Sequence, residues 1–174
     1  LTIALLSRLL STVELGQYLV CAATVLIFTP AAQFGFRQLV LADAPTAYED
    51  SESRGAGLYW SAFLALTLLL VLFFCAFVFG FAPGLQSVLR SETFIEHAVP
   101  VGLWVTLSAL REFLAEDFRI RRKLRGAAFV EGVAAPAVTL GLITIAFVSD
   151  ADFDLATALR CAVLGHAVIA IGAL

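Results

Sequence analysis

Hydrophobic residues in this chain gather in long runs that charged residues interrupt only at intervals. The longest run lies between Arg54 and Arg90, where 35 residues follow one another without a formal charge. A helix needs about 20 apolar residues to cross a bilayer, whereas a strand of a membrane barrel shows about ten residues in alternation. Because the runs are long and continuous, they predict membrane-spanning helices rather than barrel strands.

The runs predict an all-α, polytopic membrane protein with about six transmembrane helices. Residues 1–174 form a single partial bundle, with spans near 1–10, 15–42, 57–82, 96–114, 126–148 and 155–174. Because both ends of the chain lie inside apolar runs, we expect a fragment of a longer protein with further helices.

Helix-capping patterns occur at the predicted joints. Ser11-x-x-Glu14 and Thr93-x-x-Glu96 both fit a capping box before an apolar run, and Asp152 or Asp154 is placed to cap the last span. Prolines lie after two other spans, where we expect them to stop the helix: Pro45 and Pro83.

Composition supports the membrane assignment and excludes several classes of site. The chain is 61% hydrophobic and 14% charged, which a soluble domain of 174 residues could not cover without large exposed apolar patches. The cysteines stand singly, at Cys21, Cys75 and Cys161, so we expect small core residues and neither a disulfide framework nor a metal site. No cofactor motif and no feature that favours nucleic-acid binding is present.

Basic residues concentrate in one short connection, between the fourth and fifth spans. They are Arg111, Arg119, Arg121, Arg122, Lys123 and Arg125. The positive-inside rule therefore predicts that the 111–125 connection is cytoplasmic. Apolar residues recur at four-residue spacing through this connection, which indicates an interfacial amphipathic helix that anchors the topology or contacts a pyrophosphate-bearing lipid headgroup.

Ionisable residues within the spans are candidate site residues, because an isolated charge at mid-bilayer costs at least ~2.5–3.5 kcal/mol. Arg37 and Arg111 lie near cytoplasmic helix ends, where the helix dipole and snorkelling also explain them. Arg8 and Glu131 occupy dipole-favourable ends, where lining a polar cavity is the alternative. His166 lies near mid-membrane, as a hydrogen-bonded neutral side chain or a proton relay. Glu131 is the other candidate for a proton or ion relay.

Small residues line the 126–148 span around Pro136. They favour close helix packing and a bend near the proline, with a substrate path as the alternative.

The first forty residues contain a family-like pattern. Arg8-Leu-Leu-Ser-Thr-Val-Glu-Leu-Gly-Gln-Tyr18 precedes an apolar run that ends in Gln33-Phe-Gly-Phe-Arg37, and a basic Arg119-x-Arg121-Arg122 turn follows later. This layout resembles the polysaccharide-transporter branch of the multidrug/oligosaccharidyl-lipid/polysaccharide exporter superfamily, which includes O-antigen flippases. Ser11 stands where that family usually has glycine.

The resemblance implies most of the first lobe of a two-lobe transporter in a bacterial inner (plasma) membrane. Such proteins are not enzymes; they flip a lipid-linked oligosaccharide or polysaccharide precursor to the outer leaflet by alternating access. Their partners are membrane lipids and, in the same assembly process, a polysaccharide polymerase and glycosyltransferases. By this analogy the expected substrate-binding residues are Arg8, Arg37, Arg111 and Arg122.

Two other classes stay open. A cation-coupled multidrug exporter shares the fold and would be favoured by a carboxylate deep inside the first lobe, where we expect none. A polytopic membrane enzyme or scaffold of polysaccharide assembly is the other alternative, although the connections are too short for an aqueous active site.

Overall fold

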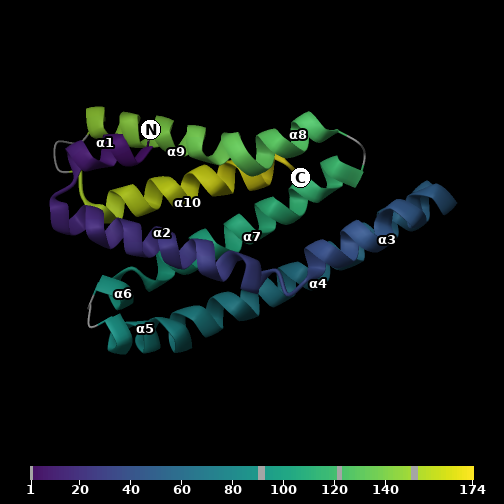
Figure 1. Ribbon diagram of the computed structural model, residues 1–174, viewed down its shortest axis with the longest axis horizontal. Coiled ribbons are helices and arrows are strands. Elements are labelled where there is room, and N and C mark those ends of the chain that lie inside the picture. The colour runs from purple at the N-terminus through teal and green to yellow at the C-terminus, as the bar shows by residue number, and fades with distance from the viewer. Residues whose placement is uncertain (1, 90–92, 121–122, 150–152) are drawn as a thin grey trace.

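The computed structural model describes residues 2–89, 93–120, 123–149 and 153–174, and these ranges are helical with no strand (Figure 1). They contain five helical rods that are long and apolar enough to cross a membrane, in agreement with a polytopic all-α protein. The bounds are α1 (Thr2–Leu9), α2 (Thr12–Ala32), α3 (Phe36–Asp50), α4 (Glu52–Ala76), η1 (Phe77–Phe81), α5 (Ala82–Leu89), α6 (Thr93–Glu96), α7 (Ala98–Ile120), α8 (Leu124–Ala128), η2 (Phe129–Ala134), α9 (Ala135–Ser149) and α10 (Leu155–Gly172).

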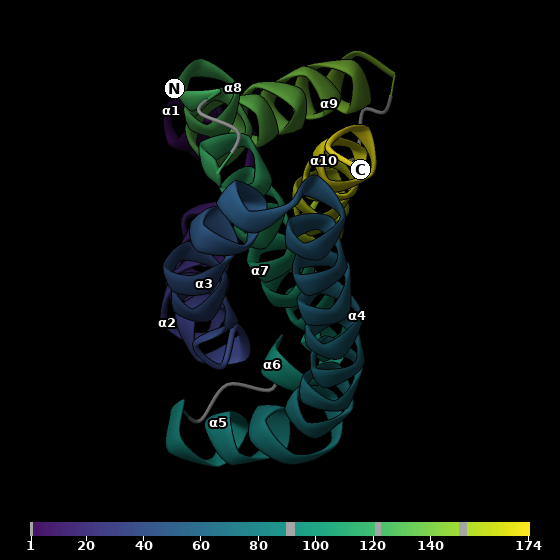
Figure 2. The ribbon, with the colours of Figure 1, turned by 90° about the vertical axis from the view of Figure 1, so that its right-hand side faces the viewer.

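Helix α7 is the centre of the bundle. It packs against α2, α4 and α10, and more locally against α3, α8 and η2 (Figure 2). Val101, Val105, Ala109 and Phe113 are fully buried and follow one another at four-residue spacing, so they form one face of the helix. Phe113 stacks on Tyr59 of α4 with ring centroids 5.4 Å apart. This apolar stripe holds α7 between its neighbours.

The outer surface of the bundle is apolar. Leu26 is 76% exposed and Phe79 and Val148 are each 80% exposed, at levels that a soluble monomer rarely tolerates over large areas. Cys21 and Cys161 are buried as expected, but Cys75 lies on the exposed surface of α4 and is not a core residue. Such a surface suits the hydrocarbon core of a bilayer.

Two helix starts carry the predicted caps. The Ser11 hydroxyl accepts a hydrogen bond from the Glu14 N–H at 3.3 Å, and the Glu14 carboxylate accepts one from the Ser11 N–H at 3.0 Å. Asp154 Oδ1 accepts from the Thr157 N–H at 2.8 Å, and this bond holds the pKa of Asp154 below its ordinary value. We call the end of the bundle that contains these two caps the capped end. Asp152 lies outside the described residues, and Glu96 ends the four-residue α6 rather than capping α7.

Prolines do not stop the helices at the predicted places. The chain stays helical through Pro45 to Asp50 and through Pro83 to Leu89. A π-helical segment, η1, lies directly before Pro83, and a second, η2, lies directly before Pro136. Proline lacks an N–H and its ring crowds the preceding turn, so a locally wider turn lets the helix pass a proline that would otherwise break it.

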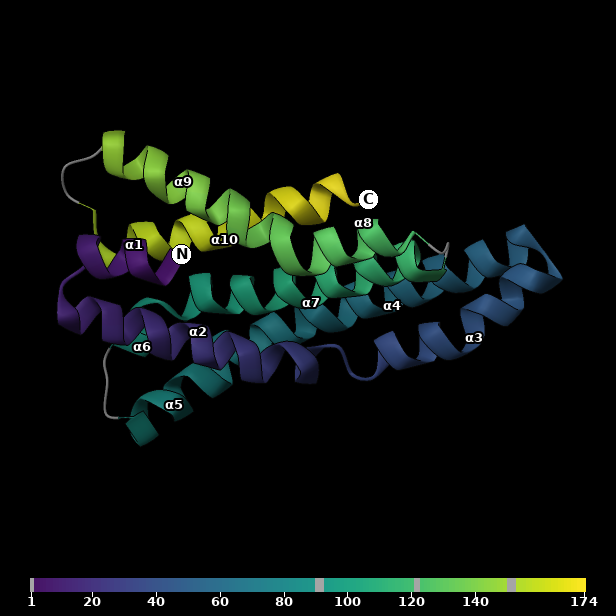
Figure 3. The same ribbon diagram turned by 45° about the horizontal axis from the view of Figure 1, so that its top comes forward.

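The predicted span 15–42 is two helices. Phe34 and Gly35 adopt positive φ values of 48° and 78°, which end α2 and begin α3 in a new direction. Helix α3 then pairs with α4 in a hairpin that extends beyond the other helices (Figures 1 and 3). Gly35 tolerates this left-handed backbone without a Cβ penalty. The expected first span, 1–10, is the eight-residue α1, which lies beside α9.

Small residues allow close packing at Gly102, where a Cβ would lie 3.1 Å from the rings of Phe74 and Phe77, and at two further glycines. A Cβ at Gly126 would lie 2.8 Å from the Phe118 ring, and a Cβ at Gly165 would meet the hydroxyl of Thr139 on α9. Gly132 and Gly141, however, face open space. Small residues therefore serve helix packing only at part of the predicted small-residue face.

Candidate functional site

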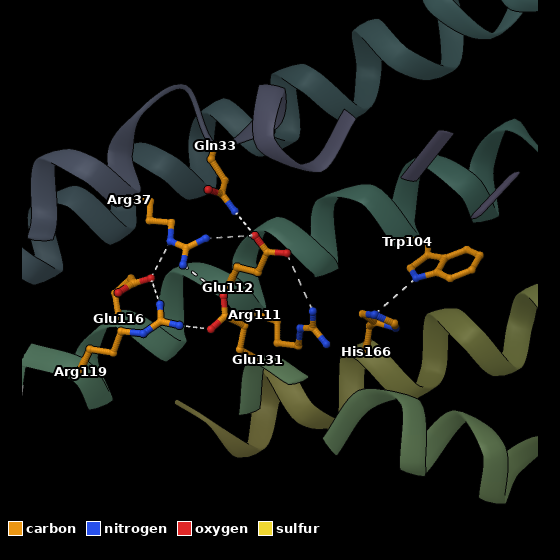
Figure 4. A network of polar contacts seen from close by, with 9 residues as sticks. All are labelled: Gln33, Arg37, Trp104, Arg111, Glu112, Glu116, Arg119, Glu131 and His166. Carbon is orange, nitrogen blue, oxygen red and sulfur yellow. Dashed lines mark hydrogen bonds and ion pairs between the residues drawn. The ribbon is translucent and has the colours of Figure 1, made fainter. Parts of the chain in front are cut away.

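Four charged side chains form a closed ring at the end of the bundle where α7 ends and α8 begins, which we call the basic end (Figure 4). Arg37 comes from the first turn of α3, Glu116 and Arg119 from the end of α7, and Glu131 from η2. Arg37 Nε donates to Glu116 Oε1 at 2.6 Å, and Arg37 Nη2 donates to Glu131 Oε1 at 3.1 Å. Arg119 donates to both carboxylates and closes the ring. We call Arg37, Glu116, Arg119 and Glu131 the ionic ring.

The ionic ring is charge-balanced and partly withdrawn from solvent. Glu116 has a side chain that is 0% exposed, whereas those of Arg37 and Arg119 are 29% and 27% exposed. Each carboxylate contacts both guanidinium groups, so every charge has two partners of opposite sign. Such pairing offsets the desolvation that isolated buried charges would suffer. The ring therefore joins three separate helical elements at one point.

The turn between α2 and α3 extends this network. Gln33, the last residue before the turn, donates its amide N–H to Glu112 Oε2 at 2.6 Å. The same carboxylate oxygen lies 3.8 Å from Arg37 Nη1. Because Gln33 caps the end of α2 and Arg37 lies in the first turn of α3, the break in the helix is what directs both side chains toward α7.

The 111–125 segment is not an interfacial amphipathic helix. Phe113, Leu114 and Glu116 are buried in the bundle, and α7 ends at Ile120 before α8 begins at Leu124. Glu112, Glu116 and Arg119 instead form one polar stripe at helical spacing that faces Arg37 and Glu131. The charges of this segment therefore turn inward as far as Arg119.

A cavity of about 510 Å³ lies beside the ionic ring, between α1, α2, α7, the η2–α9 rod and α10. Its wall is mostly apolar, as in many ligand sites, but contains a limited set of polar groups. Those polar groups are Thr2, Tyr18, Thr29, Trp104, Ser108, Arg111, Glu112, Glu131 and His166.

Arg111 is the least satisfied charge of this cavity. Its side chain is 9% exposed, its Nη2 lies 4.0 Å from Glu112 Oε1, and its Nε has no hydrogen-bond partner. The hydroxyl of Thr29, 4% exposed and also on the cavity wall, has no partner either. The cavity therefore presents unused hydrogen-bond donors in an apolar surrounding.

His166 is fully engaged on both ring nitrogens. Its Nε2 accepts from the Trp104 indole N–H at 3.4 Å, and its Nδ1 lies 2.9 Å from the carbonyl oxygen of Ala162. A carbonyl only accepts, so the proton sits on Nδ1 and the ring is neutral. This arrangement matches the hydrogen-bonded neutral side chain that the sequence left open, and the relay role stays a prediction.

The structure brings together some of the predicted site residues and separates others. Arg37, Arg111, Glu131 and His166 all lie in the ionic ring or on the cavity wall. Arg8 lies toward the capped end, in a separate groove between α1 and α9. Arg122 lies outside the described residues. Sequence reasoning missed Gln33, Glu112, Glu116 and the pairing of Arg119, although the spacing of the last three along α7 was a readable signal.

Within the described parts of the chain, no three His, Cys, Asp or Glu side chains gather as metal ligands. The polar groups of the cavity offer charge and hydrogen bonds to a ligand. Comparison with models of protein families, with curated proteins and with solved structures finds no match to this chain.

Proposed function

We propose that this chain forms part of a transporter that flips a lipid-linked oligosaccharide or polysaccharide precursor across a bacterial plasma membrane. The direction is from the cytoplasmic to the outer leaflet, by alternating access, and the basic end faces the cytoplasm. Three features support the proposal: the resemblance of residues 8–37 to exporters of this branch, the concentration of basic residues at one end, and the polar cavity inside an apolar bundle. A polysaccharide polymerase and glycosyltransferases are the proposed partners.

The observation that carries this proposal is Arg111. A buried cation at membrane depth costs several kcal/mol unless it is paired, and its nearest carboxylate oxygen is 4.0 Å away. A purely structural position would be served better by an apolar residue of similar size. An intramembrane ionisable group on a cavity wall is therefore a functional candidate, and the guanidinium is the natural partner of phosphate because it donates two parallel hydrogen bonds.

The cavity suits the headgroup of such a substrate in size and polarity. Its volume of about 510 Å³ lies within the range of about 300–1,000 Å³ typical of ligand sites. Arg111 would receive the diphosphate, and the hydroxyls of Thr29 and Ser108 would donate hydrogen bonds to its oxygens. The lipid tail would stay in the bilayer.

The ionic ring gives this arrangement a closed end. It ties α3, α7 and η2 together beside the cavity, so the basic end cannot open without separating its charges. An anionic headgroup that approaches from this end competes with Glu116 and Glu131 for the two arginines. Substrate entry would then supply the interactions that the opened ring loses.

The test is a flipping assay with the full-length protein in proteoliposomes. The probe is a fluorescent polyprenyl-diphosphate-linked saccharide, whose leaflet is read by a membrane-impermeant quencher. Arg111→Met should abolish flipping while the protein stays folded, and Arg125→Met, which removes an exposed cation outside the network, should flip normally. Equal flipping by both variants would contradict the proposal.

A cation-coupled exporter is a second candidate, and the structure offers an observation in its favour. Glu112 and Glu131 lie on the cavity wall and Glu116 is fully buried beside it, whereas the sequence led us to expect no deep carboxylate. Such carboxylates suit binding of protons or of cationic drugs. Efflux of a cationic dye driven by a proton gradient, and its loss in Glu131→Gln, would favour this candidate over the flippase.

A further inference from the structure

A second groove lies between α7 and α10 at the capped end, far along the bundle from the ionic ring. Its volume is about 540 Å³. Residues from the end of α6, the α6–α7 joint and the first turns of α7 form one wall, and residues from the first half of α10 form the other. They are Glu96, His97, Val99, Pro100 and Leu103 on one side, and Ala156, Arg160, Val163 and Leu164 on the other.

The groove changes from polar to apolar along its length. Glu96 ends α6 and His97 directly precedes α7, whereas Leu103 lies six residues after His97, about 9 Å further along the bundle at 1.5 Å per residue. On α10, Arg160 precedes Val163 and Leu164 in the same way. Because α7 and α10 both begin at the capped end (Figure 1), the polar residues of both walls lie at that end of the groove and the apolar residues lie further along it.

The two charges at the mouth of the groove are opposite in sign and do not satisfy each other. Glu96 and Arg160 are both exposed, and within the described residues neither forms an ion pair or a side-chain hydrogen bond, although Asp154 at the start of α10 attracts Arg160 electrostatically. Glu96 and Arg160 would gain little by pairing with each other, because an exposed ion pair contributes little to the free energy of unfolding. A ligand that carries both a negative and a positive group could contact both side chains at once.

We propose that this groove binds a zwitterionic aminophospholipid. Arg160 and His97 hold the phosphate, Glu96 accepts hydrogen bonds from the primary ammonium, and one acyl chain lies along Val99, Leu103 and Leu164. The charge arrangement selects this headgroup. An anionic phosphatidylglycerol would lack a partner for Glu96, and the quaternary ammonium of phosphatidylcholine carries no N–H to donate. This site is independent of the flipping function and rests only on the chain being a membrane protein.

The groove around Arg8 supplies an internal control. It is lined by Ala4, Leu5, Arg8, Leu140 and Thr144, so it has a cation but no carboxylate. It should bind phosphate-bearing lipids without preferring an ammonium. Removing its charge should therefore leave the selectivity of the α7–α10 groove unchanged.

The test is native mass spectrometry of the full-length protein, released from detergent after incubation with phosphatidylethanolamine, phosphatidylglycerol and phosphatidylcholine at equal concentration. We expect phosphatidylethanolamine to be retained best. Arg160→Gln should lower its occupancy about fivefold or more, as loss of a charged hydrogen-bond donor predicts. Glu96→Gln should remove the preference over phosphatidylglycerol, and Arg8→Gln should keep it.

Two results would overturn the proposal. One is retention of phosphatidylethanolamine by the Arg160→Gln and Glu96→Gln variants at the level of the unmodified protein. The other is equal retention of all three lipids by the unmodified protein, which would also be the outcome if another helix of the full-length protein covers the groove. Unchanged melting temperatures of Arg160→Gln and Glu96→Gln would establish that both variants are folded, so that a change in lipid retention comes from the altered side chain.

Discussion

Neutralising Glu116 is the sharpest test of the ionic ring. In Glu116→Gln the side chain keeps its size, so packing is preserved while the negative charge between Arg37 and Arg119 is lost. Glu131 then remains as the only ring carboxylate for two guanidinium groups. Arg37 and Arg119 then share one negative charge of the ring instead of two.

The size of the effect follows from burial. Breaking a fully buried ion pair costs about 3–5 kcal/mol, because a charge is left without a partner. Arg37 and Arg119 are 29% and 27% exposed, so water can solvate part of the released charge. We therefore expect Glu116→Gln to lower the free energy of unfolding by about 2–3 kcal/mol, below the range for a fully buried pair.

The measurement is reversible unfolding in mixed micelles with increasing sodium dodecyl sulfate, followed by tryptophan fluorescence. Trp104 lies on α7 beside the cavity and reports on this region. The matched control is Asp43→Asn, which removes an exposed charge from α3 and should change stability by less than about 0.5 kcal/mol. A double-mutant cycle with Arg37→Gln should yield a coupling energy of about 1–3 kcal/mol.

The reasoning would be refuted by either of two results. One is a Glu116→Gln variant within about 0.5 kcal/mol of the unmodified protein, the spread of ordinary surface substitutions. The other is strict additivity of Glu116→Gln and Arg37→Gln, which would mean that the two side chains do not interact in the folded state.

Three further outcomes follow from other parts of the fold. Gly165→Ala should lower the free energy of unfolding by about 1–3 kcal/mol, because the new methyl group meets Thr139, whose backbone N lies 3.0 Å away and cannot move aside. Gly141→Ala, in open space, is the control. Equal melting temperatures of the two variants would contradict the packing of α9 on α10. Gly35→Ala should cost about 1 kcal/mol because φ is 78° there, and Gly57→Ala should not; chemical unfolding of the pair decides this. Asp154→Ala should cost about 1 kcal/mol near neutral pH through loss of the cap. Because the folded pKa of Asp154 is lowered, this contribution to stability is present above the unfolded pKa of about 3.9 and is lost as the pH falls through the folded pKa. The free energies of unfolding of the variant and the unmodified protein, measured from pH 7 down to pH 3, should therefore converge. A constant difference would argue against a charged cap.

Most of the spans and two of the caps were readable from the sequence because they depend on local pattern. Length and hydropathy define a membrane helix, and Ser11 with Glu14 satisfies its own neighbouring backbone, so no distant residue is needed. The break at Phe34 and Gly35 was not predicted, because glycine also occurs inside helices and the apolar residues that follow Arg37 extended the predicted span to residue 42. Pro83 was misread for the opposite reason, since the π-helical turn that accommodates it leaves no mark in composition.

The candidate site was predicted only in part because its contacts are long-range. Arg37 lies 79 residues from Glu116 and 94 from Glu131, so no local spacing could reveal the ring. Arg37 and Glu131 each had a sufficient local explanation at a helix end, which concealed their pairing. Arg8 also lies at a helix end, but it lines another groove, because the topology of the bundle determines which helix ends meet.

The two π-helical segments also bear on how related sequences should be compared. A π turn behaves as a single residue inserted into an α-helix, so η1 rotates everything after Phe81 relative to α4, and η2 rotates α9 relative to α8. A relative that lacks Pro83 or Pro136 would have no need of the extra residue. Single-residue gaps in an alignment should therefore fall within 77–81 and 129–134, and a deletion there would preserve the helix while restoring one continuous lipid-facing stripe.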